Sequence, residues 1–275
     1  NLPQAPYYFE GRFSNGPVAV EYMAQALGVS LDDRAWGGAT TGRSNFLDKQ
    51  GELAHTGVQD QVDGYVAEHG SNGLNSQALY VLWAGGNDMI FGPNQATADQ
   101  AAQQMMQALD TLYAAGARQF FVPLMPDLSL MPGLKGLSWL LQPASEAYNQ
   151  SLKDALLGAS TSHPDATIQS FDTVSYLRGL PSAPGNTLTD ASTACVKGTF
   201  EKVISVCDNP QEHVYWDGTH FTTGLHAQLG AAFAAAVPET ASGTQMAWGL
   251  GGLASLLWRA RARRARRGER VTQPD

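Results

Sequence analysis

Apolar and polar residues follow two patterns along the first 236 residues of the chain. Apolar residues three or four apart predict amphipathic helices, and short apolar runs that end at turn residues are typical of buried strands. We expect helices at residues 17–27, 57–68, 97–115, 144–157, 172–177 and 223–236. We expect strands at residues 33–36, 78–83, 118–123 and 167–171, and an irregular segment at 180–214.

The predicted strands and helices alternate along the chain. This order indicates an α/β fold with a doubly wound, flavodoxin-like parallel sheet and helices on both of its faces. In such a sheet the loops at the carboxyl ends of the strands meet at one edge, where ligands bind. Three loops with Gly or polar residues fall at that edge: Gly37-Gly38, Gly85-Gly86-Asn87-Asp88 and Asp217-Gly218-Thr219-His220.

Asp217 and His220 have the spacing of an acid–base pair. An Asp three residues before a His can orient the imidazole, which then takes a proton from a nucleophilic hydroxyl. The Asn87 amide and the Gly38 N–H could both donate to an oxyanion. Each motif also has a structural interpretation: a capped helix start for the Asp–His pair, an Asx cap for Asn87 and a tight turn for the glycines.

Two cysteines, Cys195 and Cys207, lie in the irregular segment. In an exported protein they would form a disulfide that stabilises the fold by about 2–3 kcal/mol, and in a reducing compartment they would be free thiols. Their spacing argues against a zinc site shared with His213, because zinc sites use paired short gaps. The wide spacing of His213, His220 and His226 argues against a metal as well, and we expect no cofactor.

The formal net charge of −8 hides an asymmetry between the body of the chain and its end. Seven of the 17 basic residues lie between Arg259 and Arg270, so the part up to Pro238 has 10 basic and 22 acidic residues. Such a body repels nucleic acid, and we expect no nucleic-acid partner. A hydrophobic content of 43% with 15% charged residues suits a globular enzyme with a real core.

Together these loops resemble the GDSL or SGNH hydrolase family, whose sequence blocks contribute Ser, Gly, Asn and His. Residues 12–24 are similar to the stretch that follows the family's first block, and residues 35–41, 82–88 and 216–221 are similar to its second, third and fifth blocks. The resemblance extends from about Asn1 to Val237. It implies an SGNH-type fold without metal or cofactor, and a Ser-His-Asp mechanism acting on carboxylic esters, including lipids.

The resemblance also implies the role of each site residue. His220 is the general base, Asp217 orients it, and Gly38 and Asn87 bind the oxyanion. The family's Gly-Asp-Ser block is missing, and in the family it lies just ahead of the segment that begins here at Pro6. The strand before that block lies inside the family's sheet, so its removal would leave unpaired strand edges.

We therefore expect the nucleophile to lie upstream of Asn1, the chain alone to be inactive and the longer protein to be an esterase. Two serines near the motifs, Ser14 and Ser44, do not follow a buried strand in a sharp turn and are poor candidates for the nucleophile. We expect Ser14 to cap a turn before the first helix instead. The alternative functions are a non-catalytic surface module that binds glycan or lipid and, among enzymes, a carbohydrate acetylesterase or a phospholipase.

The chain divides near Pro238, which predicts a hydrolase domain at residues 1–237 and a tail at 238–275. Residues 246–258 are apolar and Gly-rich, and the arginine cluster follows them. The tail resembles a PEP-CTERM sorting signal of exported bacterial proteins, which implies export to the cell envelope or the medium and membrane anchoring through this segment. Thirteen residues are short for a bilayer span of about 20, so an unstructured basic tail or an amphipathic surface helix are the alternatives.

Overall fold

The computed structural model describes residues 3–183 and 185–238, so the predicted tail with its apolar segment 246–258 lies almost entirely outside the described residues. The described residues up to Ala236 belong to one unit of the chain. Its centre is a three-stranded parallel sheet in the order β1-β2-β3, formed by Leu79–Val81, Gln119–Pro123 and Thr167–Phe171.

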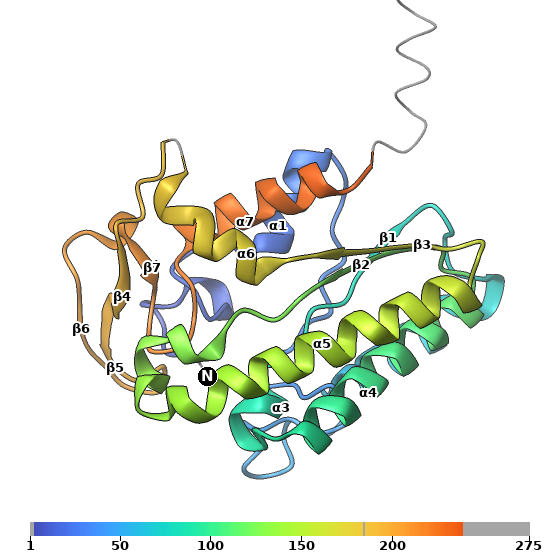
Figure 1. The fold of residues 1–275 in the computed structure, drawn as a ribbon, viewed down its shortest axis with the longest axis horizontal. Helices are drawn as coiled ribbons and strands as arrows, with labels where there is room; N and C mark the ends of the chain where they lie inside the picture. Colours follow the sequence, from blue (N-terminus) through green and yellow to red (C-terminus); the bar gives the residue numbers. More distant parts are fainter. Residues whose placement is uncertain (1–2, 184, 239–275) are drawn as a thin grey trace, which may run out of the picture. The chain divides into compact units, whose positions relative to one another are not determined.

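Helices cover both faces of this sheet, as Figure 1 shows. One layer consists of α4 (Gln95–Ala114) and α5 (Ser138–Ser162). The other consists of α1 (Ala19–Leu27), α6 (Thr173–Gly179) and α7 (Thr223–Ala236). The chain therefore has the predicted α/β fold.

The two crossover connections place α4 and α5 in the same layer. β1 leads through α3 (Gly86–Phe91) and α4 to β2, and β2 leads through two 3-10 turns, Leu128–Leu130 and Pro132–Leu137, and α5 to β3. Both connections join neighbouring parallel strands, and the right-handed preference of such connections puts their helices on one side. Because the strands are parallel, the loops that follow them lie at one edge of the sheet and the loops that precede them lie at the other.

Phe233 fixes α7 on the other face of the sheet. Its ring centroid lies 5.3 Å from those of Trp83 and Phe121 and 4.9 Å from that of Phe171, in edge-on arrangements. These three residues belong to or follow the three strands, and Phe233 itself is fully buried. Edge-on aromatic pairs contribute about 0.5–1.5 kcal/mol each beyond their burial. The helix that begins three residues after His220 is thereby held against the sheet.

Most predicted helices and strands are confirmed, and β3 and α7 have the predicted bounds. The second helix, α2 (Val58–His69), is shifted by one residue from its prediction. Asp172 caps α6 through the Ser175 N–H, at 3.0 Å. α5 is longer than predicted and includes Pro143 near its start, where the missing proline N–H removes only one helix hydrogen bond.

The predicted strand at residues 33–36 is wrong. Residues 31–36 are exposed and pair with no strand in the part of the chain that the structure describes. The side chain of Arg34 forms ion pairs with Asp32 and with Glu68 of α2. An isolated extended segment becomes a strand only where a neighbour satisfies its backbone N–H and C=O groups, so this one stays an exposed coil.

The expectation of an irregular segment at 180–214 is also wrong in part. β4 (Asp190–Ala194) pairs in parallel with β7 (His213–Tyr215), and β5 (Val196–Gly198) pairs antiparallel with β6 (Val203–Val206). These strands are short, β4, β5 and β6 are largely exposed, and all four lack the alternation of apolar and polar residues that would predict them. The disulfide between Cys195 and Cys207 is present, which confirms that prediction.

No helix within residues 3–183 and 185–238 is long and apolar enough to cross a bilayer.

Candidate active site

The loop between β7 and α7 closes on itself and on the strand before it. The Trp216 N–H donates to the carbonyl oxygen of His220 at 2.7 Å. At the end of the loop, the Thr222 N–H donates to the carbonyl oxygen of Val214 at 3.0 Å. Because both ends of the loop are tied to the same short stretch, the backbone between Asp217 and His220 has little freedom.

The carboxylate of Asp217 accepts hydrogen bonds from two backbone N–H groups and from three side chains, one of which is the Thr219 hydroxyl at 3.4 Å. The N–H groups of Thr219 and His220 donate to its Oδ1 at 2.9 and 2.8 Å. The Tyr8 hydroxyl donates to Oδ2 at 2.6 Å, and His220 Nδ1 lies 2.8 Å from the same oxygen. Burial raises the pKa of Asp217, but the hydrogen bonds from His220, Tyr8 and Thr219 outweigh burial and hold it below its usual value.

Asp217 leaves one nitrogen of His220 free for chemistry. With Nδ1 bonded to the carboxylate, Nε2 is the nitrogen that can accept a proton, and it has no hydrogen-bond partner among the described residues. The ring is partly exposed and lies beside two aromatic rings, that of Phe13 with its centroid 4.7 Å away at a tilt of 33° and that of Phe200 at 6.4 Å. An imidazole held in this way has the tautomer and orientation that a general base needs.

The two predicted oxyanion donors lie on neighbouring segments. Asn87 is in the first turn of α3, and its Nδ2 donates to the carbonyl oxygen of Ala39 at 2.7 Å, which leaves the second N–H of the amide free. The Gly38 N–H donates to no group within the described residues. Gly38 has φ +82°, and an added Cβ would lie 2.4 Å from Asn45 Oδ1, so both the backbone and the packing require glycine there.

Phe13 connects the acid–base loop to the oxyanion segment. One face of its ring lies against His220, and its Cε2 would be 2.3 Å from a Cβ added at Gly37. The ring therefore packs directly on the glycine before Gly38. The structure thus brings the three predicted loops to one place, and the roles of Asp217, His220, Gly38 and Asn87 stay predictions.

Two further titratable residues near the site are held in structural roles. Burial lowers the pKa of His226 to about 4, and the Ala19 N–H donates to its Nδ1 at 3.3 Å, so His226 is neutral at physiological pH. Burial raises the pKa of Asp88, partly offset by hydrogen bonds from the Thr41 hydroxyl and N–H. Asp88 thereby ties the turn after Gly38 to α3.

The structure does not place either candidate serine as a nucleophile. Ser14 is buried and its Oγ has no hydrogen-bond partner among the described residues, so the predicted capping role is wrong. Its side chain points into the interior, and Glu21 bonds the N–H of Val18 at the start of α1 instead. Ser44 Oγ lies 3.0 Å from Thr40 Oγ1 within its own loop.

The histidines do not converge on a metal site. His213 Nδ1 lies near Asp190 and the carbonyl oxygen of Thr193, whereas His220 and His226 have the partners given above. Among the described residues, no group of three or more His, Cys, Asp or Glu side chains could hold a metal ion.

Two contributors to the site, Tyr8 and Phe13, are absent from the sequence prediction. Tyr8 is separated from Asp217 by 209 residues, and neither periodicity nor spacing relates them. Both aromatic residues lie between Pro6 and Gly16, where the resemblance to the family assigns no role to a single residue. Their contacts with the dyad become visible only in the fold.

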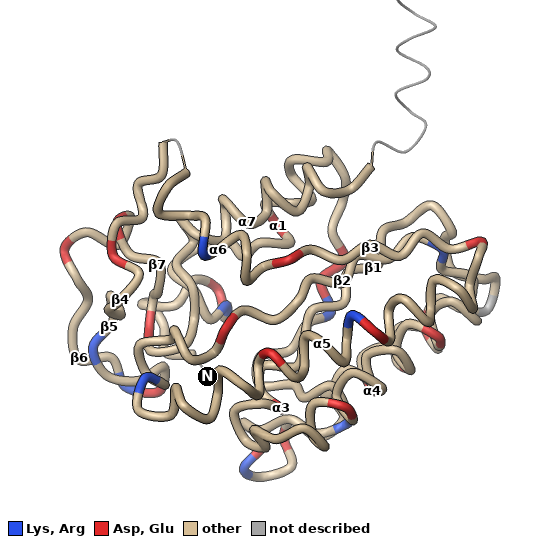
Figure 2. Tube along the Cα trace, in the orientation of Figure 1, with Lys and Arg blue, Asp and Glu red and all other residues tan. Residues whose placement is uncertain are grey.

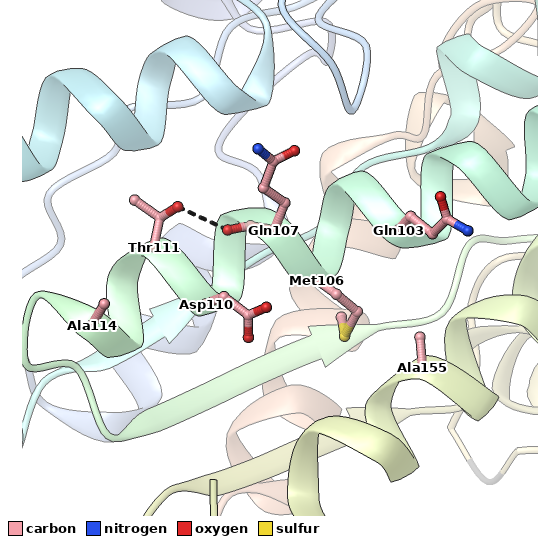
Figure 3. A pocket seen from close by; sticks show the side chains of 7 residues that line it. All are labelled: Gln103, Met106, Gln107, Asp110, Thr111, Ala114 and Ala155. Carbon is pink, nitrogen blue, oxygen red and sulfur yellow. Dashed lines mark hydrogen bonds between the residues drawn. The ribbon is translucent and has the colours of Figure 1, made fainter. Parts of the chain in front are cut away.

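A hollow of about 460 Å³ lies on the surface of α4, next to α5, and is not part of this site. Figure 3 shows the side chains that line it: Gln103, Met106, Gln107, Asp110, Thr111, Ala114 and Ala155. Thr111 turns its hydroxyl back to the carbonyl oxygen of Gln107, at 2.9 Å. The hollow contains no nucleophile paired with a base, so it does not enter the function proposed below.

Comparison with known proteins agrees with the geometry. The chain is 29% identical to a thermolabile hemolysin of Vibrio parahaemolyticus, over 82% of this chain and 56% of the hemolysin. It is 24% identical to a phosphatidylcholine-sterol acyltransferase of Aeromonas hydrophila, over 83% of this chain and 81% of that protein. It is 22% identical to inactive GDSL esterase/lipase-like protein 25 of Arabidopsis thaliana, over 83% of this chain and 63% of that protein.

The family profile for GDSL-like lipase/acylhydrolases matches residues 4–233, which is most of the chain and includes all three loops of the site. The chain therefore belongs to the GDSL-like lipase/acylhydrolase family.

Proposed function

We propose that this chain is the acid–base and oxyanion part of a serine hydrolase of carboxylic esters. The observation that carries the proposal is the Asp217–His220 pair, in which a buried, hydrogen-bonded carboxylate fixes Nδ1 and leaves Nε2 free. The family membership and the similarity to a phosphatidylcholine-sterol acyltransferase support acyl-transfer chemistry.

The nucleophilic serine is proposed to come from residues that precede Asn1 in a longer protein. Two edges in the structure support this origin. β1 pairs only with β2 among the described strands, and the exposed segment at residues 31–36 pairs with none. In the family's sheet order, the strand that leads to the serine lies inside the sheet, and these are the two segments that it would join.

The proposed reaction proceeds in two acyl-transfer steps. The serine Oγ attacks the ester carbonyl carbon while its proton moves to His220 Nε2, and the Gly38 N–H and the Asn87 amide bind the oxyanion. His220 then gives the proton to the departing alkoxide, which leaves as the alcohol. Water attacks the acyl-enzyme with His220 again as base, and the carboxylic acid is released.

A fluorophosphonate probe tests this proposal, because it labels only a serine activated by a base. We expect the longer protein to be labelled at one serine upstream of Asn1, and His220→Ala to abolish the label. We expect residues 1–275 alone to remain unlabelled. A label on Ser14 or Ser44, or on no serine of a folded longer protein, would contradict the proposed nucleophile.

The second candidate is a non-catalytic surface module that binds glycan or lipid. The similarity to a GDSL esterase/lipase-like protein that is named inactive supports this second candidate. It predicts no ester hydrolysis by the longer protein, together with saturable ligand binding. Phospholipase and carbohydrate acetylesterase activities remain alternatives within the enzyme class. The acidic residues scattered over the described part (Figure 2) favour uncharged or zwitterionic esters over anionic ones.

The remaining proposals concern location. We propose that the protein is exported to the cell envelope or medium and that residues 238–275 serve as a sorting or anchoring segment. The disulfide between Cys195 and Cys207 supports export, because disulfides persist in oxidising compartments. Fractionation of cells that produce the longer protein, with and without residues 238–275, tests it. Recovery of both forms in the cytoplasm would refute export.

A further inference from the structure

Exposed aromatic side chains gather around the two predicted oxyanion donors. The exposed fraction is 54% for Trp36, 39% for Phe46 and 63% for Phe91. Trp36 precedes the Gly37-Gly38 turn, Phe46 lies in the loop after it, and Phe91 is the last residue of α3. Single exposed apolar residues are ordinary, but a group of them beside a reactive site marks a surface that binds something apolar.

Backbone contacts tie these aromatic residues to the donors. The Phe46 N–H donates to the carbonyl oxygen of Gly38 at 2.9 Å, and the Ala39 N–H donates to that of Trp36 at 3.3 Å. The segment that positions the Gly38 N–H therefore also positions both of these side chains. A ligand atom bound by the Gly38 N–H is therefore next to the segment that carries both rings.

The same relation holds on α3. Phe91 lies four residues after Asn87, which places the two side chains on one face of the helix, one turn apart. The rings of Phe46 and Phe91 then meet, with centroids 4.9 Å apart and a tilt of 36°. The ring pair bridges the two segments that provide the oxyanion donors.

The acidic side chain of α3 is occupied by hydrogen bonds within the protein. The carboxylate of Asp88, which is also on α3, is directed to the Thr41 hydroxyl at 2.7 Å and accepts the Thr41 N–H as well. Its negative charge is therefore engaged away from the rings. A hydrocarbon chain can be transferred from water to these rings without desolvating an ion.

We propose that Trp36, Phe46 and Phe91 form an acyl-chain subsite, which selects esters of medium-length fatty acids over acetyl esters. The inference rests on the proposed function, since the ester carbonyl oxygen bound by Gly38 and Asn87 is what starts the acyl chain at the rings. From that point the chain extends along the pair of Phe46 and Phe91. The subsite sets substrate choice and takes no part in proton transfer.

The experiment compares nitrophenyl octanoate with nitrophenyl acetate as substrates of the longer protein. Phe46→Ala and Phe91→Ala should each lower the ratio of kcat/KM for octanoate to that for acetate about tenfold, because each removes apolar contact with the acyl chain. Phe91→Leu should restore most of the ratio. The matched control is Trp139→Ala, which removes an aromatic side chain that is 74% exposed at the start of α5. An unchanged ratio in both Phe variants, or an equal fall in the control, overturns the subsite.

A calorimetric titration separates this inference from the proposed function. If the longer protein hydrolyses no ester, the proposed function fails, and binding of decanoate to that same protein decides the subsite. We expect saturable binding of decanoate but not of acetate, weakened at least fivefold by Phe46→Ala and by Phe91→Ala. Absence of binding, or binding that neither variant weakens, overturns the subsite.

Discussion

The acid–base loop and the oxyanion segment differ in how they are held. Asp217 and His220 lie on one loop and are bonded to each other and to the loop's backbone, so nearby residues set most of their mutual geometry, to which Tyr8 adds one distant donor. Gly38 and Asn87 depend on contacts between distant segments, such as the bond from Asn87 Nδ2 to the carbonyl oxygen of Ala39. A local motif can thus prescribe a proton-transfer pair, whereas an oxyanion site has to be assembled by the fold.

Removal of the base is the largest expected effect and tests the locally determined half. His220→Ala in the longer protein should lower kcat for nitrophenyl butyrate by about 10⁴–10⁶-fold, because no other group can take the serine proton. Asp217→Asn should lower it by about 10⁴-fold, since the amide favours the wrong tautomer of His220. His69→Ala, which removes an exposed histidine on α2, is the control. Activity within tenfold of wild type in either dyad variant would refute the assignment.

Loss of an oxyanion donor is the next largest effect and tests the assembled half. Asn87→Ala should lower kcat by about 10²–10³-fold, with KM changing little, because the amide acts mainly on the developing charge. The control is Asn209→Ala, at an exposed asparagine in the loop before β7. Steady-state kinetics on nitrophenyl acetate measures both variants. A change confined to KM would mean that Asn87 binds the ground state and not the oxyanion.

The same difference between local and long-range contacts explains how well the sequence predicts each region. The sequence predicts the bounds of α7 correctly because the spacing of its apolar residues is a local pattern. It also predicts the Asp217–His220 pair, because the two residues are only three positions apart. The strand at residues 33–36 was mispredicted because a strand needs a neighbour that local pattern does not supply. Tyr8 was missed because 209 residues separate it from Asp217.

The disulfide tests whether the acid–base loop also depends on the part of the chain beside it. The Val196 N–H donates to the carbonyl oxygen of Trp216 at 2.7 Å, so the disulfide at Cys195 borders the loop. Replacing both Cys195 and Cys207 by Ser should lower the free energy of unfolding by about 2–3 kcal/mol, because the unfolded chain gains freedom. Urea unfolding at pH 7 measures this loss, and dithiothreitol should produce the same loss in the wild type. An unchanged midpoint would show that the loop is held without the disulfide.

The smallest expected effect concerns the long-range hydrogen bond from Tyr8 to the carboxylate of Asp217. Tyr8→Phe removes the hydroxyl that donates to Asp217 Oδ2 at 2.6 Å, but Asp217 keeps its donors from Thr219 and His220. The free energy of unfolding at pH 7 should therefore fall by about 1 kcal/mol, the lower end for a buried acceptor. Tyr7→Phe, at the exposed neighbouring tyrosine, is the control.

The dependence of this loss on pH separates the hydrogen bond from simple packing. The pKa of Asp217 is lowered in the folded protein, so the stabilisation by its partners is fully present above the unfolded pKa of about 3.9 and is lost as pH falls through the folded pKa. Removing the Tyr8 hydroxyl raises that folded pKa. The difference between wild type and Tyr8→Phe should consequently be greatest at neutral pH and shrink below about pH 4. A difference that stays constant from pH 7 to pH 3 in urea unfolding would mean that Tyr8 contributes packing alone, and the Asp217 carboxylate would then be stabilised by the donors of its own loop.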